Sequence, residues 1–184
     1  MQLRYLKSLV SPQDGQAKVT AFAWSPNNAK LAVVTVDKVV LMFDDHGEKR
    51  DKFSTKASDP NNIKKQYQVK ALAFSPDSTR IAVGQTDDIV FVYKIGEEWG
   101  ERKTICNKFI QESAVTAMVW PPDQPAFIIG LASGKIRLCN VRTNKSQPLY
   151  GTDSCVVALA AKLVVLLTFI FGKFNKSHQF NCNY

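Results

Sequence analysis

The residues most able to act as general acids or bases are few and widely separated in this sequence. Histidine is the usual choice for such chemistry, because its pKa lies near neutral pH. The two histidines are His46, within the turn-like string "DDHGE", and His178, near the end of the chain. Neither has an acid or a nucleophile at a spacing that indicates a catalytic pair, so both are predicted to be solvated. The sequence predicts no catalytic residue.

Two pairs of adjacent aspartates could suggest carboxylates that share a proton or a metal. They are Asp44–Asp45 and Asp87–Asp88. Neighbouring residues of a strand point to opposite faces, and aspartate is common in turns because its side chain bonds to nearby backbone. A turn role is therefore preferred for both pairs.

The four cysteines do not form a metal-binding pattern. They stand at positions 106, 139, 155 and 182, with no C-x-x-C pair and no histidine at ligand spacing. We predict free thiols in a reducing compartment. No glycine-rich phosphate-binding loop precedes a helix either. The sequence predicts no metal, no cofactor and no small-molecule substrate.

Lysines surround one aromatic residue between positions 56 and 70. Lys64 and Lys65 lie closest to Tyr67 in sequence, and the whole chain has a net charge of +8. Such a group could contact nucleic acid or an acidic protein, although a solvated loop is the preferred interpretation. Lys64, Lys65 and Tyr67 are candidate partner-binding residues. Trp99, in the turn "GEEWGE", is a fourth, because an exposed tryptophan is a common contact residue.

These residues must be positioned by a repeated unit, which the sequence shows in three copies. The copies start at Val19, Val69 and Val115. An aromatic residue follows five positions later, then a Ser-Pro or Pro-Pro turn, and a further landmark lies twenty-four positions from each start. The repeat positions are Trp24, Phe74 and Trp120, and then Phe43, Tyr93 and Cys139. We expect the two tryptophans and Phe74 to pack between neighbouring units.

Each copy consists of short segments with alternating apolar residues, which predict strands. In the middle copy they are Val69 to Phe74, Arg80 to Gly84, Ile89 to Ile95 and Arg102 to Asn107. Four-stranded antiparallel units at this period are typical of β-propeller blades. The predicted fold class is all-β, an incomplete propeller of three four-stranded blades plus the start of a fourth. The blades cover about 19–55, 69–109 and 115–151, and the fourth begins at 156.

The copies resemble the WD-repeat family. The turn "SPD" and the strand "VVLMFDD" look like that family's pattern, with Phe43–Asp44 where the Trp-Asp signature would stand. The other copies depart further, and none has the Gly-His pair. The family's polar tetrad is therefore expected to be absent, which leaves apolar packing as the main cohesion between blades.

A more specific resemblance covers about Met1 to Ala161. The strings "SPQDGQAKVTAFAWSPNNAKLAVVTVD" and "KALAFSPDSTRIAVGQTDDIVFVYKIGEEWG" resemble the N-terminus of the large intraflagellar transport subunits, which combine WD-repeat propellers with a helical-repeat tail. The resemblance implies a non-enzymatic scaffold for cilium assembly, with other IFT-B subunits as partners. It also implies a location in the cilium, the basal body and the cytoplasm.

Two end segments depart from the repeat. Residues 1–10 alternate like a strand that would close a propeller ring. Residues 162–184 leave the repeat in mid-blade, and a non-homologous end, such as that of an alternative splice form or a prematurely terminated gene model, is preferred. A blade strand of unusual composition and a membrane anchor are the alternatives, although the apolar run is short for a spanning helix. The domain is thus expected to cover 1–161, followed by a non-repeat tail.

Two other functions remain open at the level of sequence. A basic propeller could bind nucleic acid, which predicts an affinity that falls steeply with salt. A membrane-attached variant could use the apolar tail. Both are ranked below the scaffold.

Overall fold

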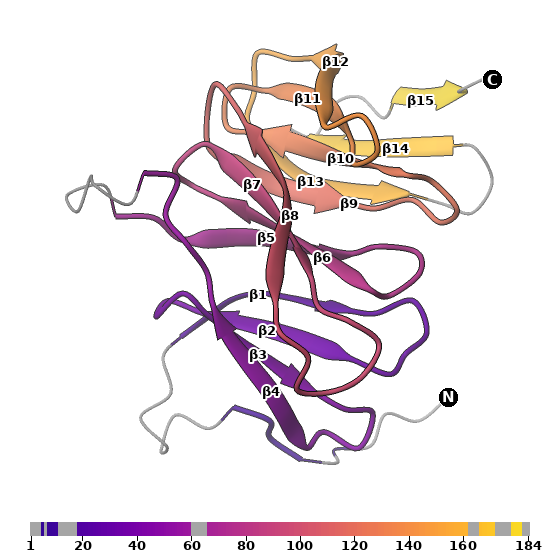
Figure 1. Ribbon diagram of the computed structural model, residues 1–184. Coiled ribbons are helices and arrows are strands. Elements are labelled where there is room, and N and C mark those ends of the chain that lie inside the picture. The colour runs from indigo at the N-terminus through magenta and orange to yellow at the C-terminus, as the bar shows by residue number, and fades with distance from the viewer. Residues whose placement is uncertain are drawn as a thin grey trace.

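The fold is a row of antiparallel sheets. The computed structural model describes residues 5, 7–10, 18–59 and 66–161, with the backbone of 166–171 and 178–181, and these residues form strands and no helix (Figure 1). Consecutive strands pair within each sheet. Blade 1 contains β1 (Val19–Trp24), β2 (Leu31–Thr35), β3 (Val39–Phe43) and β4 (Lys49–Ser54); blade 2 contains β5 (Val69–Phe74), β6 (Arg80–Gln85), β7 (Ile89–Lys94) and β8 (Thr104–Ile110); blade 3 contains β9 (Val115–Val119), β10 (Ala126–Leu131), β11 (Lys135–Asn140) and β12 (Lys145–Gly151); the fourth sheet contains β13 (Val156–Ala161), β14 (Leu166–Phe171) and β15 (His178–Asn181).

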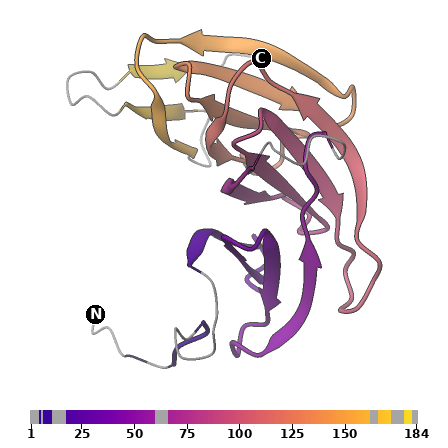
Figure 2. The same ribbon diagram turned by 90° about the vertical axis from the view of Figure 1, so that its left-hand side faces the viewer.

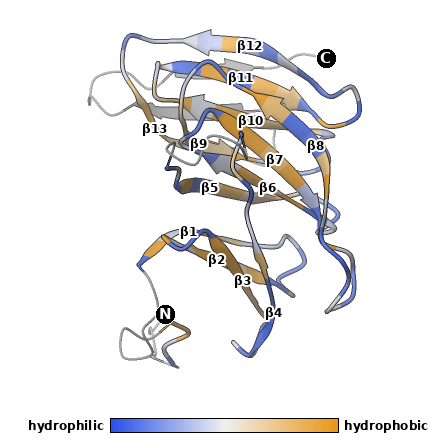
Figure 3. Cartoon of the chain, turned by 60° about the vertical axis from the view of Figure 1, so that its left-hand side comes forward, coloured by the Kyte–Doolittle hydropathy of each residue, from blue (hydrophilic) through white to orange (hydrophobic). Residues whose placement is uncertain are grey.

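The sheets stack face to face and fan out into an open arc (Figure 2). Alternation along each strand divides the apolar side chains between two interfaces. In β6, Ile81 and Val83 belong to the core shared with blade 1, whereas Ala82 belongs to the core shared with blade 3. Middle strands are therefore apolar on both faces, and hydrophilic residues concentrate in the outer strands and turns (Figure 3). The predicted fold class is confirmed.

The turns repeat as well as the strands. The turn between the second and third strands uses a left-handed residue in every blade: Lys38 at φ 66°, Asp88 at φ 67° and Gly134 at φ 84°. Before the second strand, the Ser-Pro turns close with a bond from Ser25 N to Lys30 O at 2.8 Å, and from Ser75 N to Arg80 O at 2.9 Å. The same turn geometry thus connects β1 to β2 and β5 to β6.

The first described residues lie against the outer face of blade 1. Leu9 and Val10 pack on the apolar cluster formed by β2 and β3, and the Nζ of Lys7 lies 2.7 Å from the Oε1 of Glu48. Tyr5 and 7–10 have no strand assignment. The other residues of 1–10 lie outside the described part, so a closing strand there stays a prediction.

Beyond residue 161 the backbone forms two further strands. β14 pairs with β13 from Val156↔Phe171 to Ala161↔Leu167, and β15 pairs with β14. This antiparallel pairing is the arrangement expected of a blade. The separation of 162–184 as a non-repeat tail stays a prediction. The described residues contain no helix that could span a membrane.

Candidate protein-interaction surfaces

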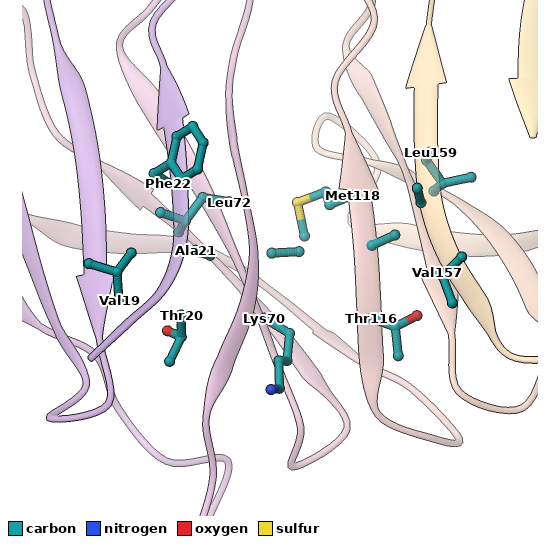
Figure 4. Close-up of a pocket in the computed structure, with 13 residues that line it drawn as sticks. Val19, Thr20, Ala21, Phe22, Lys70, Leu72, Thr116, Met118, Val157 and Leu159 are labelled. Atoms are coloured by element: carbon teal, nitrogen blue, oxygen red, sulfur yellow. The ribbon is translucent and has the colours of Figure 1, made fainter. Parts of the chain in front are cut away.

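The innermost strand of each sheet faces one shared hollow. β1, β5, β9 and β13 line an open space of about 620 Å³, which opens on the concave side of the arc (Figure 4). Residues at equivalent repeat positions of the four strands lie side by side there, because the sheets are stacked in the same orientation.

Polar groups on the wall of the hollow occupy one repeat position. Thr20 Oγ1 donates to Val34 O at 3.3 Å, and Thr116 Oγ1 donates to Gly130 O at 3.1 Å. Both hydroxyls are thus used to hold the neighbouring strand. Lys70 stands at the same position in blade 2 and is exposed, and its ammonium has no hydrogen bond to another described residue. It gives the wall a positive charge.

Exposed apolar side chains line the hollow on its two end strands, Val19 and Phe22 on β1 and Val157 on β13. Phe22 is 68% exposed, whereas Leu72 at the same repeat position is 7% exposed. Leu72 packs against the blade that precedes it, while no described blade precedes β1. Phe22 is consequently an aromatic side chain available for contact.

Trp24 departs from the prediction that it packs between blades. It is 49% exposed, whereas the equivalent Phe74 is 4% exposed. The same absence of a preceding described blade explains the difference. Trp120 does pack on an interface, with its ring centroid 5.1 Å from that of Phe127. The other repeat positions, Phe43, Tyr93 and Cys139, occupy equivalent sites on their third strands, and all three are buried.

The hairpin that contains Trp99 binds blade 1. The buried Lys30 donates from Nζ to Gly96 O at 2.9 Å and to Glu97 O at 2.7 Å, and it lies 5.2 Å from the centroid of Trp99. Burial, followed by the charge of Lys103, lowers the pKa of Lys30. Trp99 is half-buried in this contact, so a role for it in partner binding stays a prediction.

A second contact fixes the same hairpin. The Lys103 ammonium pairs with the Asp51 carboxylate, which also accepts a bond from Gly100 N at 3.2 Å. Burial raises the pKa of Asp51, but the bonds from Lys103 and the backbone outweigh it and hold the pKa below its ordinary value. We call the contacts of Lys30 and Asp51 with residues 96–103 the blade 1–2 latch. The sequence reasoning missed the latch; its only signal was the long turn "GEEWGE".

The other predicted contact residues separate. Tyr67 is buried, its hydroxyl lies 3.0 Å from Thr55 Oγ1, and Lys38 Nζ lies 4.5 Å from its ring centroid. Burial raises the pKa of Tyr67. Lys64 and Lys65 lie outside the described residues. Tyr67 therefore supports the blade 1–2 interface, and partner binding by these three residues stays a prediction.

The acidic pairs serve turns. Asp44 Oδ1 accepts bonds from the backbone of His46 and Glu48 at 3.1 and 2.8 Å. Asp87 is 3% exposed, and its Oδ2 accepts from Ser58 N at 2.7 Å, which ties the linker between blades 1 and 2 to the β6–β7 turn. These contacts agree with the turn interpretation.

Burial favours the neutral thiol at two of the cysteines. Burial raises the pKa of Cys139 to about 11 and also raises that of Cys106. Because the thiolate is the nucleophile and the metal ligand, neither thiol is activated here. No group of three or more potential metal ligands gathers within the described segments.

Comparisons with known proteins agree with this geometry. The family model for WD domain, G-beta repeat, matches residues 5–44 and 61–94. The solved structure of U3-55K superposes with a TM-score of 0.74, 16% identity, and coverage of 91% of this chain and 50% of that chain. The RRP9 WD40 repeats give a TM-score of 0.68 at 16% identity, with 84% and 45% covered. At this identity the two structures support the fold alone.

Closer relatives are intraflagellar transport proteins. The chain is 64% identical over 159 residues to intraflagellar transport protein 172 homolog of Rattus norvegicus, and 62% identical over 159 residues to that of Homo sapiens. It is 51% identical over 168 residues to intraflagellar transport protein 172 of Chlamydomonas reinhardtii. These alignments cover 86–89% of this chain but only 9–10% of each relative. The chain thus carries WD repeats with the β-propeller fold, and over most of its length it is similar to the N-terminal WD region of intraflagellar transport protein 172.

Proposed function

We propose that this chain is a non-enzymatic protein-interaction scaffold of intraflagellar transport, which binds other IFT-B subunits during cilium assembly. The cilium and its basal body are the proposed sites of action, with a cytoplasmic pool. The observation that supports this most directly is the exposed Phe22 on the hollow, beside the inner strands of the neighbouring sheets. Exposed aromatic side chains on a rigid frame are frequent anchors of protein interfaces.

The relatives support the biological setting. Identity of 62–64% extends over 159 residues, which is 86% of this chain, so most of the three blades lies within the matched region. Variable contacts on a constant sheet framework are how propellers present binding surfaces.

The test is recovery of IFT-B subunits with the tagged chain from ciliated cells. Phe22→Asp places a charge on the hollow, and we expect it to reduce recovery by about fivefold or more, as loss of an anchor residue does. Val36→Asp is the matched control, because Val36 is an exposed apolar residue in a turn outside the hollow.

Three outcomes would contradict the proposal. They are no recovery of transport subunits by the unmodified chain, equal loss in both variants, and recovery of RNA in their place.

A further inference from the structure

One cross-strand position differs in charge between the blades. At the turn end of the second and third strands, Lys30 and Asp44 flank the last pair Leu31↔Phe43 in blade 1, and Ala126 lies opposite Asn140 in blade 3. Blade 2 has Arg80 opposite Lys94 at this position. Like charges directly across a strand pair destabilise a sheet, so this pair needs a reason other than stability.

Blade 2 supplies hydrogen-bond acceptors to Lys30 of blade 1, but blade 3 supplies none to Arg80 and Lys94 of blade 2. Lys30 is 5% exposed and binds two carbonyls of the hairpin that runs from Ile95 to Lys103 (Figure 1). The equivalent turn of blade 3 runs only from Val141 to Asn144. Asn107 bonds to this short turn, through Val141 O at 3.0 Å and Asn144 Oδ1 at 3.2 Å.

Arg80 and Lys94 are left without a hydrogen bond or ion pair from their side chains to any described residue. Arg80 is half-buried and Lys94 is exposed. Both lie near Cys106: burial raises the pKa of that thiol, and the charges of Arg80 and then Lys94 oppose the rise. Arg80 pairs with Lys94 across β6 and β7, and Lys94 pairs with Thr104 on β8, two residues before Cys106. The two cations therefore form one positive site at this end of blade 2.

One acidic residue, Asp77, lies near the site, but its carboxylate already accepts hydrogen bonds within its own turn. Burial raises the pKa of Asp77, and bonds from Ser75 and Thr79, with a smaller contribution from the charge of Arg80, bring it below its ordinary value. The Asp77 carboxylate accepts from Thr79 N at 3.0 Å and from the Ser75 hydroxyl. It belongs to the β5–β6 turn, and the two cations keep a positive surplus.

We propose that Arg80 and Lys94 bind the carboxylates of an acidic segment from a partner protein. A guanidinium takes a carboxylate in two parallel hydrogen bonds, and an adjacent ammonium can take a second one as a point charge. The compact pair suits neighbouring acidic side chains better than the long phosphate row of a nucleic acid, which needs a stripe of cations. This inference rests on the proposed function only in that the chain binds proteins, and it concerns a surface separate from the hollow.

The test uses the purified chain and a fluorescein-labelled hexaglutamate peptide, with binding followed by anisotropy at low salt. Replacing Arg80 and Lys94 by Gln should weaken binding by about tenfold, since two charge-assisted contacts are lost. The matched control replaces Lys49 and Lys52 by Gln, which removes the same charge from exposed positions on β4. It should change the affinity by less than about twofold.

Location is checked by chemical protection. Bound peptide should slow the alkylation of Cys106, measured by mass spectrometry, and leave Cys155 unchanged, since both thiols are exposed but only Cys106 adjoins the cations. Phe22→Asp should bind the peptide normally, so failure of the hollow as an interface and failure of this site give different results.

A structural role is separated from a binding role by Lys94→Glu. This change creates an opposite-charge pair with Arg80, so the urea midpoint of unfolding should rise while peptide binding is lost. Equal weakening by the β4 control, equal protection of both cysteines, or displacement of the peptide by an oligonucleotide of equal charge at lower concentration would each overturn the proposal. A fall in the urea midpoint of Lys94→Glu would do the same.

Discussion

At the residue scale, Tyr93 occupies the repeat position of the signature tryptophan and makes a hydrogen bond to the linker between blades 1 and 2. The side chain is 3% exposed, its ring lies 4.9 Å from that of Phe53, and its hydroxyl accepts a bond from Lys56 N at 3.3 Å. Burial raises the pKa of Tyr93 to about 12. The neutral phenol thus joins the linker after β4 to the core of blade 2.

This shift predicts a pH dependence of stability. The folded-state pKa lies above that of the unfolded chain, so the contribution is fully present below pH 10 and is lost as the pH rises toward 12. The loss should reach at most about 3 kcal/mol, at about 1.4 kcal/mol per pKa unit. Urea unfolding of the unmodified chain and of Tyr93→Phe should diverge in slope against pH over this range.

The control for that experiment is Tyr5→Phe, because Tyr5 is 79% exposed. It should follow the unmodified chain at every pH. An alkaline loss of the same size in Tyr93→Phe would show that Tyr93 is not its source.

Sequence reasoning identified repeat positions better than it identified their environments. Spacing alone placed Trp24, Phe74 and Trp120 in equivalent sites; in the structure Trp24 and Phe74 end β1 and β5, and Trp120 follows the last residue of β9. It could not show that Trp24 is half exposed, because exposure depends on which sheet lies next to β1. Lys30 was equally hidden: nothing in its own sequence neighbourhood indicates that its ammonium is received by a turn more than sixty residues away.

At the element scale, glycines on the second strands set how closely adjacent blades approach. A Cβ at Gly84 would lie 2.6 Å from Val115 Cγ1, and one at Gly130 would meet the side chain of Val156. Neither glycine has a positive φ, so the backbone conformation does not require glycine at these positions. Glycine is required because the neighbouring blade lies too close for a Cβ. The first strand of the next sheet rests directly on the β6 or β10 backbone.

Gly84→Ala should therefore destabilise the chain by about 1–3 kcal/mol, the usual effect of overpacking a core. Adding Val115→Ala removes the methyl groups that the new Cβ meets, so the double variant should be less destabilised than the sum of the single variants, by about 0.5–3 kcal/mol. Urea unfolding of all four proteins gives this coupling energy. Additive effects would show that Val115 does not limit the approach.

Strand positions were predictable where alternation is strong. The segment Val69 to Phe74 was predicted with the bounds that β5 has. The outer strand of blade 2 was predicted at Arg102 to Asn107, whereas β8 runs from Thr104 to Ile110. The end of β7 explains the shift, because its last residue Lys94 pairs with Thr104, and residues 102 and 103 lie beyond that pair.

At the scale of the whole molecule, no described blade covers the free face of blade 1. Side chains at one repeat position are therefore buried in blade 2 and exposed in blade 1. Leu72 is enclosed by two blades, while Phe22 faces the solvent. Leu72→Ala should cost about 2–5 kcal/mol, as large-to-small changes in a core do. Phe22→Ala should change the unfolding free energy by no more than about 0.5 kcal/mol.

Chemical denaturation of the two variants checks this contrast, and binding of the dye ANS should fall only in Phe22→Ala. A large loss of stability from Phe22→Ala would mean that its side chain is covered in solution. The architecture could be predicted from sequence because three copies hold register, whereas the surfaces could not, because they depend on how the copies are stacked.

The latch also gives the blades an order. Their strands and turns are nearly interchangeable, so a nascent chain could stack them wrongly, a known hazard of repeat proteins. In a wrong stacking the Lys30 ammonium would enter a dry interface without the Gly96 and Glu97 carbonyls, and an uncompensated buried charge is strongly unfavourable. The contact of Lys30 with the 96–103 hairpin therefore favours blade 2 as the neighbour of blade 1 and disfavours other stackings.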